Sequence, residues 1–217
     1  MTRHKKTLES SKVLGCVLAG GQSRRMGGGD KSLMDLGGKT MLDMILARLK
    51  PQLHDIVLNA NGNPDRFARF QLPVAADPVG DFAGPLAGVL AGMTYAHNER
   101  PDISHVISVA GDTPFFPTSL VSRFCAAVPG DRPVIALASS ADKLHPVFGL
   151  WPVSLKADLE DWLQSGKTGK VLAFVDCYDS VEVAFDADPD SGLDPFFNAN
   201  KPDDLSTVRD ALSLHSR

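Results

Sequence analysis

The residues best suited to chemistry lie in a glycine-rich segment that follows the first apolar run of the chain. This segment extends from Leu18 to Lys31 and also carries Arg24 and Arg25. Because glycine has no Cβ, the backbone can turn sharply and point successive N–H groups at an anion. Arginine forks match phosphate oxygens, and Lys31 adds a compact positive charge. The segment predicts a triphosphate site; a flexible, solvated basic loop is the alternative.

The glycine-rich segment matches neither of two common nucleotide-binding motifs. A Walker A loop that used residues 38–40 would need a glycine five residues before Gly38, where the chain has Leu33. A dinucleotide fingerprint that used Gly27 and Gly29 would need Gly or Ala at the position of Ser32. The sequence therefore predicts a different kind of nucleotide-binding loop.

A second candidate for chemistry is Asp112, which follows a buried-type apolar run and precedes Thr113 and Pro114. Its carboxylate is a hard oxygen ligand of the kind that Mg²⁺ shares with substrate phosphates. An aspartate that only forms the turn before Thr-Pro is the alternative.

The elements that must position these residues alternate between strand and helix. Strands are expected at residues 13–18, 55–59, 72–75, 105–110, 133–138, 145–150 and 181–185. Helices are expected at residues 39–49, 86–97, 118–128, 153–164 and 201–214. Such alternation predicts a three-layer, Rossmann-like α/β fold with a mostly parallel central sheet and helices on both faces. Segments 19–31 and 111–117 both follow strands, at the carboxyl edge where such sheets bind ligands.

Composition narrows the class of protein. The 217 residues fit a single domain at 13–217, preceded by a disordered basic tail at 1–12. A net charge of −4 argues against a nucleic-acid surface. The chain has no apolar run as long as the roughly 18 residues that a membrane helix needs, and its start lacks a secretory signal, so we expect a cytoplasmic protein. The scattered cysteines indicate neither disulfides nor zinc, and Cys16 and Cys125 fit the core.

Five motifs, in order, carry a family resemblance. They lie at residues 18–31, 84–88, 111–115, 145–147 and 198–205. The first resembles the signature of nucleotidyltransferases that act on sugar phosphates and on molybdopterin. Over residues 13–210 the chain is similar to the molybdenum cofactor guanylyltransferases of the MobA-like family. The resemblance implies the nucleotidyltransferase version of the fold and transfer of GMP from GTP to molybdopterin, with release of pyrophosphate and formation of the guanine dinucleotide cofactor.

The choice of base also follows from the resemblance. Cytidylyl relatives carry Leu-Ala-Ala-Gly in the first loop and lack the Gly-Pro-Leu-Ala-Gly segment. This chain has Leu-Ala-Gly-Gly at 18–21 and Gly-Pro-Leu-Ala-Gly at 84–88, which favours GTP over CTP. A cytidylyl- or sugar-phosphate nucleotidyltransferase and a non-catalytic nucleotide-binding adaptor remain alternatives. Lys31 together with Asp112 favours an enzyme, and pyrophosphate release would distinguish it from an adaptor.

The resemblance implies a role for each site residue. The catalytic residues are Lys31, Asp112 and Arg25, with Asp112 as the ligand of Mg²⁺ and Lys31 beside the α-phosphate. The nucleotide-binding residues are Leu18, Ala19, Gly20, Gly21, Lys31, Asn59, Asp77, Gly84 and Asp112, and the molybdopterin-binding residues are His145, Asn198 and Asn200.

Several of these roles have alternatives. Asn59 and Asp77 could be turn formers at strand ends, and His145 could be a structural histidine. Either Arg24 or Arg25 could be solvated instead of contacting phosphate. The expected partners are GTP, molybdopterin and, transiently, the proteins that deliver molybdopterin and the molybdoenzymes that receive the product. Nucleic acid and membrane are not expected partners.

Overall fold

The computed structural model describes residues 7–20, 30–35, 38–80, 84–187 and 192–198. Its strands are β1 (Val13–Leu18), β2 (Ile56–Asn59), β3 (Val74–Ala75), β4 (His105–Ala110), β5 (Ile135–Ser140), β6 (Lys143–Pro152) and β7 (Ser180–Ala184). Its α-helices are α1 (Met41–Leu49), α2 (Pro85–Glu99), α3 (Leu120–Ala127), α4 (Lys156–Gln164) and α5 (Val171–Val175). The helix expected at 201–214 lies outside the described residues.

The strands form one seven-stranded sheet in the order β3-β2-β1-β4-β6-β5-β7. The pairs β1–β2, β1–β4, β2–β3 and β5–β7 are parallel. Strand β6 runs antiparallel to both of its neighbours, β4 and β5. The expectation of a mostly parallel sheet is confirmed, and the reversed strand is a feature that the sequence did not reveal.

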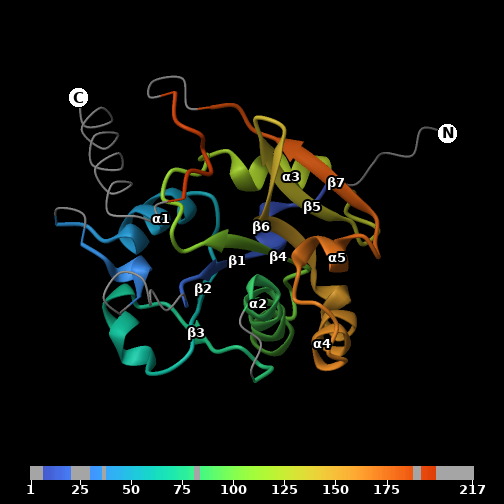
Figure 1. Ribbon diagram of the computed structural model, residues 1–217, viewed down its shortest axis with the longest axis horizontal. Coiled ribbons are helices and arrows are strands. Elements are labelled where there is room, and N and C mark those ends of the chain that lie inside the picture. Colours follow the sequence, from blue (N-terminus) through green and yellow to red (C-terminus); the bar gives the residue numbers. More distant parts are fainter. Residues whose placement is uncertain (1–6, 21–29, 36–37, 81–83, 188–191, 199–217) are drawn as a thin grey trace.

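Helices cover both faces of the sheet, which gives the molecule three layers (Figure 1). Helices α1 and α3 pack in one hydrophobic cluster, whereas α2, α4 and α5 pack in another. The side chains of β1 alternate between the two clusters: Val13 and Val17 face the first, and Leu14 and Cys16 the second. A strand buried on both faces explains why its sequence is a continuous apolar run.

Local sequence explains where α1 begins. Thr40 Oγ1 accepts a hydrogen bond from the backbone N–H of Asp43 at 3.2 Å, and Asp43 Oδ2 accepts one from Thr40 N at 2.7 Å. This capping box ends the preceding loop at Thr40. The helix therefore starts at Met41, two residues later than the apolar spacing suggested.

Two glycines permit the close packing that shapes the carboxyl edge of the sheet. A Cβ on Gly88 of α2 would lie 2.4 Å from Asn59 Oδ1, and one on Gly111 would lie 2.6 Å from the carbonyl oxygen of Leu18. Only a residue without a side chain fits at either position. As a result, the first turns of α2 lie against the end of β2, and the turn that carries Asp112 lies against the end of β1.

The start of the chain corrects one expectation. Thr7 forms an isolated antiparallel bridge with Pro129, Leu8 is buried, and Ser10–Lys12 form a turn of 3-10 helix. The prediction of a disordered tail up to residue 12 is therefore wrong for residues 7–12, because Leu8 gains an apolar environment in the core. Residues 1–6 lie outside the described residues.

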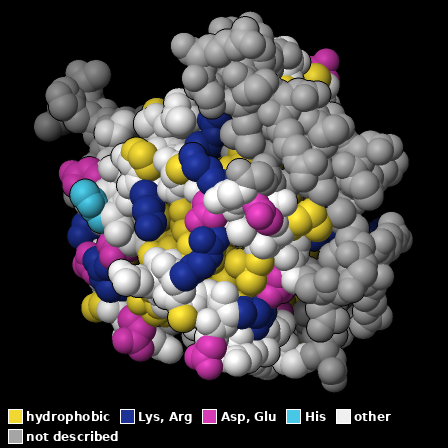
Figure 2. Space-filling view, turned by 90° about the vertical axis from the view of Figure 1, so that its left-hand side faces the viewer, with side chains coloured by type: hydrophobic (Ala, Val, Ile, Leu, Met, Phe, Trp, Pro, Cys, Tyr) yellow, Lys and Arg dark blue, Asp and Glu magenta, His cyan; other side chains and the backbone are white. Residues whose placement is uncertain are grey.

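The described surface and the cysteines agree with the composition. Among the described residues on the face seen in Figure 2, basic and acidic side chains are interspersed. None of the described helices combines the length and apolar character needed to cross a membrane. Cys16 and Cys125 are buried, as expected, and burial raises the pKa of their thiols to about 12 and about 11.

Candidate active site

The carboxyl ends of β1, β2 and β4 meet at one edge. Leu18 is in register with Asn59 on one side and with Ala110 on the other. Beyond β1, the N–H groups of Ala19 and Gly20 both donate to the carbonyl oxygen of Asn59, at 2.9 and 3.0 Å. These bonds fix the start of the glycine-rich segment against β2.

Lys31 and Asp112 lie at this edge although they are far apart in sequence. Lys31 Nζ is 3.7 Å from Asp112 Oδ2, and their side chains are 21% and 24% exposed. Ser32 Oγ donates to the carbonyl oxygen of Ala19 at 3.3 Å, which ties the residue after Lys31 to the end of β1. A cation and a carboxylate that are both accessible can share a phosphate group and a metal ion between them.

A second carboxylate, Asp77, is held by two amides. Asn59 Nδ2 donates to Asp77 Oδ1 at 2.8 Å, and Asn61 Nδ2 donates to Asp77 Oδ2 at 2.7 Å. The N–H of Asp77 donates in return to Asn61 Oδ1 at 2.8 Å. Each carboxylate oxygen retains a further lone pair, so Asp77 can still accept the two N–H donors of a guanine edge.

Asn61, which the sequence did not single out, contacts the predicted site residue Asp77. It lies two residues beyond Asn59, just past the end of β2, and its side chain is bonded to Asp77. The signal that could have revealed it is the repeated amide, Asn-x-Asn, directly after a buried strand.

The sequence also pointed to Gly84, which is the residue that precedes α2. Helix α2 begins at Pro85, and Gly88, one turn later, contacts Asn59. The free N–H groups of a helix start favour negative charge. The amino end of α2 thus lies beside the same edge as Asn59.

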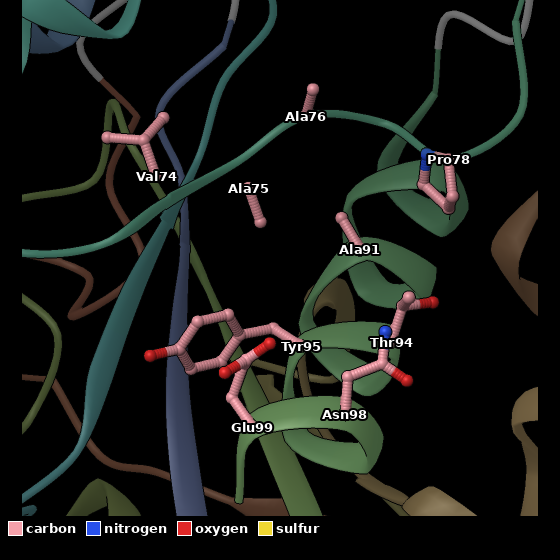
Figure 3. A pocket seen from close by; sticks show the side chains of 9 residues that line it. All are labelled: Val74, Ala75, Ala76, Pro78, Ala91, Thr94, Tyr95, Asn98 and Glu99. Carbon is pink, nitrogen blue, oxygen red and sulfur yellow. The ribbon is translucent and has the colours of Figure 1, made fainter.

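A shallow hollow of about 250 Å³ lies between β3 and α2, close to Asp77 (Figure 3). Ala76 and Pro78, the neighbours of Asp77, line one end, and Tyr95 and Glu99 of α2 lie at the other. None of the predicted site residues lines it. The hollow therefore lies beside the predicted site and is not part of it.

On the other side of β4, His145 lies beside two polar side chains, Ser140 and Asp194. Ala138 of β5 pairs with His145 of β6, so Ser140, two residues along β5, lies diagonally across from the imidazole. Ser140 Oγ is 2.7 Å from His145 Nε2 and donates to Asp194 Oδ1 at 2.9 Å. The His145 ring also stacks on Phe196, with centroids 4.6 Å apart.

A β-bulge interrupts the pairing of β5 with β6 next to His145. Leu137 pairs with Gly149, but the next residue, Ala138, pairs with His145, which leaves residues 146–148 as an insertion in β6. Pro146 has no N–H to give to a ladder, which explains the interruption there. Burial lowers the pKa of His145, Asp194 opposes that shift, and Lys143 adds to it.

The predicted site residues are therefore divided into three groups. Leu18, Ala19, Gly20, Lys31, Asn59, Asp77 and Asp112 converge on the edge formed by β1, β2 and β4, and Gly84 lies beside it at the start of α2. His145 lies on β6, and Asn198 is exposed just after Phe196. Gly21, Arg24, Arg25 and Asn200 lie outside the described residues. Besides Asn61, sequence reasoning missed Ser140 and Asp194, whose partners lie on other strands or loops.

The edge suits a metal ion that is shared with the substrate. In the described part of the chain there is no group of three or more His, Cys, Asp or Glu side chains placed to hold a metal. Mg²⁺ is commonly held by one or two carboxylates, with phosphates and water completing the shell. Asp112, half-buried and next to Lys31, fits that kind of site.

Comparison with known proteins identifies the family to which the chain belongs. Residues 15–181 match the MobA-like NTP transferase domain. The chain therefore belongs to the family of MobA-like NTP transferases, and the expectation of a nucleotidyltransferase enzyme is confirmed.

A curated relative indicates the group within this family that the chain resembles. A protein of Mesorhizobium japonicum named molybdenum cofactor guanylyltransferase is 50% identical over 194 residues, which cover 89% of this chain and 93% of the relative. This finding confirms the resemblance to that group.

Solved structures confirm the fold. The crystal structure of molybdopterin-guanine dinucleotide biosynthesis protein A from Archaeoglobus fulgidus superposes with a TM-score of 0.71 at 22% identity, covering 92% of this chain and 98% of that one. The structure of 4-diphosphocytidyl-2C-methyl-D-erythritol synthase from Anaerococcus prevotii gives 0.68 at 13% identity, covering 95% and 98%. One fold thus serves different named enzymes, so side chains must decide the substrate.

Proposed function

We propose that this chain transfers the guanylyl group of GTP to molybdopterin and releases pyrophosphate, which yields the guanine dinucleotide form of the molybdenum cofactor. The observation that carries the proposal is the convergence of the Lys31–Asp112 pair and the amide-held Asp77 on one edge. A phosphate-binding cation and a guanine-matching carboxylate are the two features that a GTP site requires. The 50% identity to a molybdenum cofactor guanylyltransferase supports the same acceptor.

In the proposed reaction, a phosphate oxygen of molybdopterin attacks the α-phosphorus of GTP. The new P–O bond forms as the bond to the β-phosphate oxygen breaks, and pyrophosphate leaves with that electron pair. The ammonium of Lys31 offsets the negative charge that builds up on the α-phosphate oxygens. Asp77 and its two amide partners orient the base, which places the α-phosphate in line for attack.

Asp112 would hold Mg²⁺, which would offset the negative charge of the triphosphate. His145, with Asn198 and Asn200, would face the acceptor, because imidazole and amide groups match the donors and acceptors of a pterin. Arg25, or Arg24, would add a second cation to the triphosphate. We place the enzyme in the cytoplasm, in transient contact with the proteins that supply molybdopterin and that receive the product.

The test is turnover with defined substrates. Purified protein would be mixed with molybdopterin, Mg²⁺ and one of GTP, CTP or ATP, and pyrophosphate release would be followed. Release that depends on molybdopterin and is fastest with GTP supports the proposal. Preference for CTP would indicate the cytidylyl branch, and binding of GTP without any release would indicate an adaptor.

A further inference from the structure

Arg66 has more polar contacts at the edge of the site than its sequence context suggests. It lies in the 3-10 helix Pro64–Phe70, and its guanidinium forms an ion pair with Asp30 through Nε. Its Nη2 donates to the carbonyl oxygen of Asn61 at 2.6 Å, and its Nη1 donates to that of Asn63. The guanidinium also lies over the Phe67 ring, 4.6 Å from the centroid.

These contacts join two parts of the proposed GTP site. On one side, Asp30 directly precedes Lys31, which pairs with Asp112. On the other, the Asn61 side chain bonds to Asp77 through both its amide nitrogen and its oxygen. Arg66 therefore connects the phosphate side of the proposed site to its base side through one guanidinium, and its side chain is only 28% exposed.

The same helix provides a natural comparison. Arg69 lies over the Phe70 ring at 4.2 Å and pairs with Asp43 at 2.6 Å, so it has the same kinds of contact as Arg66. Its partners, however, are Asp43 and Thr40 at the start of α1, which hold no predicted site residue. At 54% exposure Arg69 is also more open to solvent. The two arginines thus differ mainly in what they connect.

We propose that Arg66 is a positioning residue for GTP: it holds Asp30, and hence Lys31, in fixed relation to Asn61, and hence Asp77. The inference rests on the proposed function, because it concerns the same nucleotide site. Only arginine offers a planar fork that can bind a carboxylate and two carbonyl oxygens together. A lysine could keep the ion pair with Asp30 but would lose the simultaneous bonds to Asn61 and Asn63.

The test compares Arg66→Gln and Arg66→Lys with the matched variant Arg69→Gln. Calorimetry in the presence of Mg²⁺ gives the affinity of each protein for GTP, ATP and GMP, and thermal unfolding gives the stability of each. The ratio of GTP to ATP affinity reports on the base side, and the ratio of GTP to GMP affinity reports on the phosphate side.

For Arg66→Gln we expect both ratios to fall by roughly tenfold, the loss typical of a charge-assisted hydrogen bond. For Arg66→Lys, both affinity ratios should lie between those of Arg66→Gln and those of the unchanged protein. Arg69→Gln should keep both ratios while its thermal stability changes by a similar amount. Equal affinity ratios in Arg66→Gln and Arg69→Gln would overturn the inference. A fall in the ratio of GTP to ATP affinity without a fall in the ratio of GTP to GMP affinity would also overturn it. If the unchanged protein itself shows no preference for GTP, the proposed function fails first, and the inference falls with it.

Discussion

The two halves of the carboxyl edge are built in different ways. In the half that we propose binds the nucleotide, called the nucleotide half and formed by β3, β2, β1 and β4, parallel strands end together. Asn59, Asp77 and Asp112 lie at or just beyond the ends of β2, β3 and β4. In the half that we propose binds the acceptor, called the acceptor half and formed by β6, β5 and β7, a reversed strand and a bulge bring His145 against Ser140. The order and direction of the strands place the polar side chains of the nucleotide half. In the acceptor half, the position of His145 depends on the bulge in β6.

This difference has a functional consequence. In the nucleotide half, Lys31 pairs with Asp112, and Arg66 connects Asp30 to Asn61, which bonds to Asp77. Changes there should therefore alter rate and base choice. The acceptor half centres on one imidazole supported by Ser140 and by the Phe196 ring. Changes there should alter acceptor binding and leave GTP binding intact.

The largest effect is expected for Asp112→Ala. Loss of the carboxylate should lower kcat by about a thousandfold, the upper end for removal of one electrostatic group from an active site. The fold should remain, because Asp112 is at the sheet edge and is partly exposed. Pyrophosphate release measures the rate, with Asp142→Asn, an exposed hairpin residue, as control. Full activity of Asp112→Ala with Mg²⁺ would refute the role.

Lys31→Ala should lower kcat by about a hundredfold, since one cation beside the developing charge is lost. The matched control is Lys39→Ala, an exposed lysine in the loop before α1. The same pyrophosphate assay applies, together with thermal unfolding to confirm that the variant is folded. Equal rates for the two lysine variants would exclude Lys31 from the catalytic step.

In the acceptor half, His145→Gln should raise the KM for molybdopterin by about tenfold, the cost of one hydrogen bond to a polar ligand. The KM for GTP should not change, because the described partners of His145 are Ser140 and Phe196, which both lie outside the nucleotide half. His97→Gln, near the end of α2, is the control. A rise in the KM for GTP instead would show that the two halves are not independent.

The smallest effect is expected away from the carboxyl edge, at the opposite end of β4. His105, at the start of β4, is buried, and burial lowers its pKa from 6.5 to about 4. The unfolded chain therefore binds a proton below about pH 6.5 that the folded chain does not, so stability falls as the pH falls toward 4. Between pH 7.5 and 5.5 the loss should be about 1 kcal/mol. Urea unfolding at both pH values measures this change in the free energy of unfolding. The variant His105→Leu should lose the part of the pH dependence that comes from His105, and an unchanged pH dependence in this variant would contradict the assignment to His105.

Much of the fold could be predicted because the strands are short apolar runs that end in glycine or polar residues. The bounds of β1 and β4 agree with the sequence, and β6 is longer at both ends. The antiparallel direction of β6 could not be predicted, because an apolar run does not encode its direction. Helix α5 was missed because its five residues are too few to show a helical period.

The candidate site was predictable only where it coincides with strand ends. Asp112 and Asn59 follow directly from that rule. Arg66, Ser140 and Asp194 were missed because each acts through a partner distant in sequence: Arg66 pairs with Asp30, and Ser140 with Asp194. Such pairs depend on how loops cross the edge, which local patterns do not specify. The roles of the site residues remain predictions.

The most direct test of the central claim is nucleotide binding measured by calorimetry. GTP, CTP and ATP would be compared with Mg²⁺ present and again with EDTA, on the unchanged protein and on Asp77→Asn. We predict that GTP binds most tightly, that EDTA weakens this binding, and that Asp77→Asn reduces the preference for GTP over ATP. Equal binding of the three nucleotides by the unchanged protein, unaffected by EDTA, would contradict this prediction.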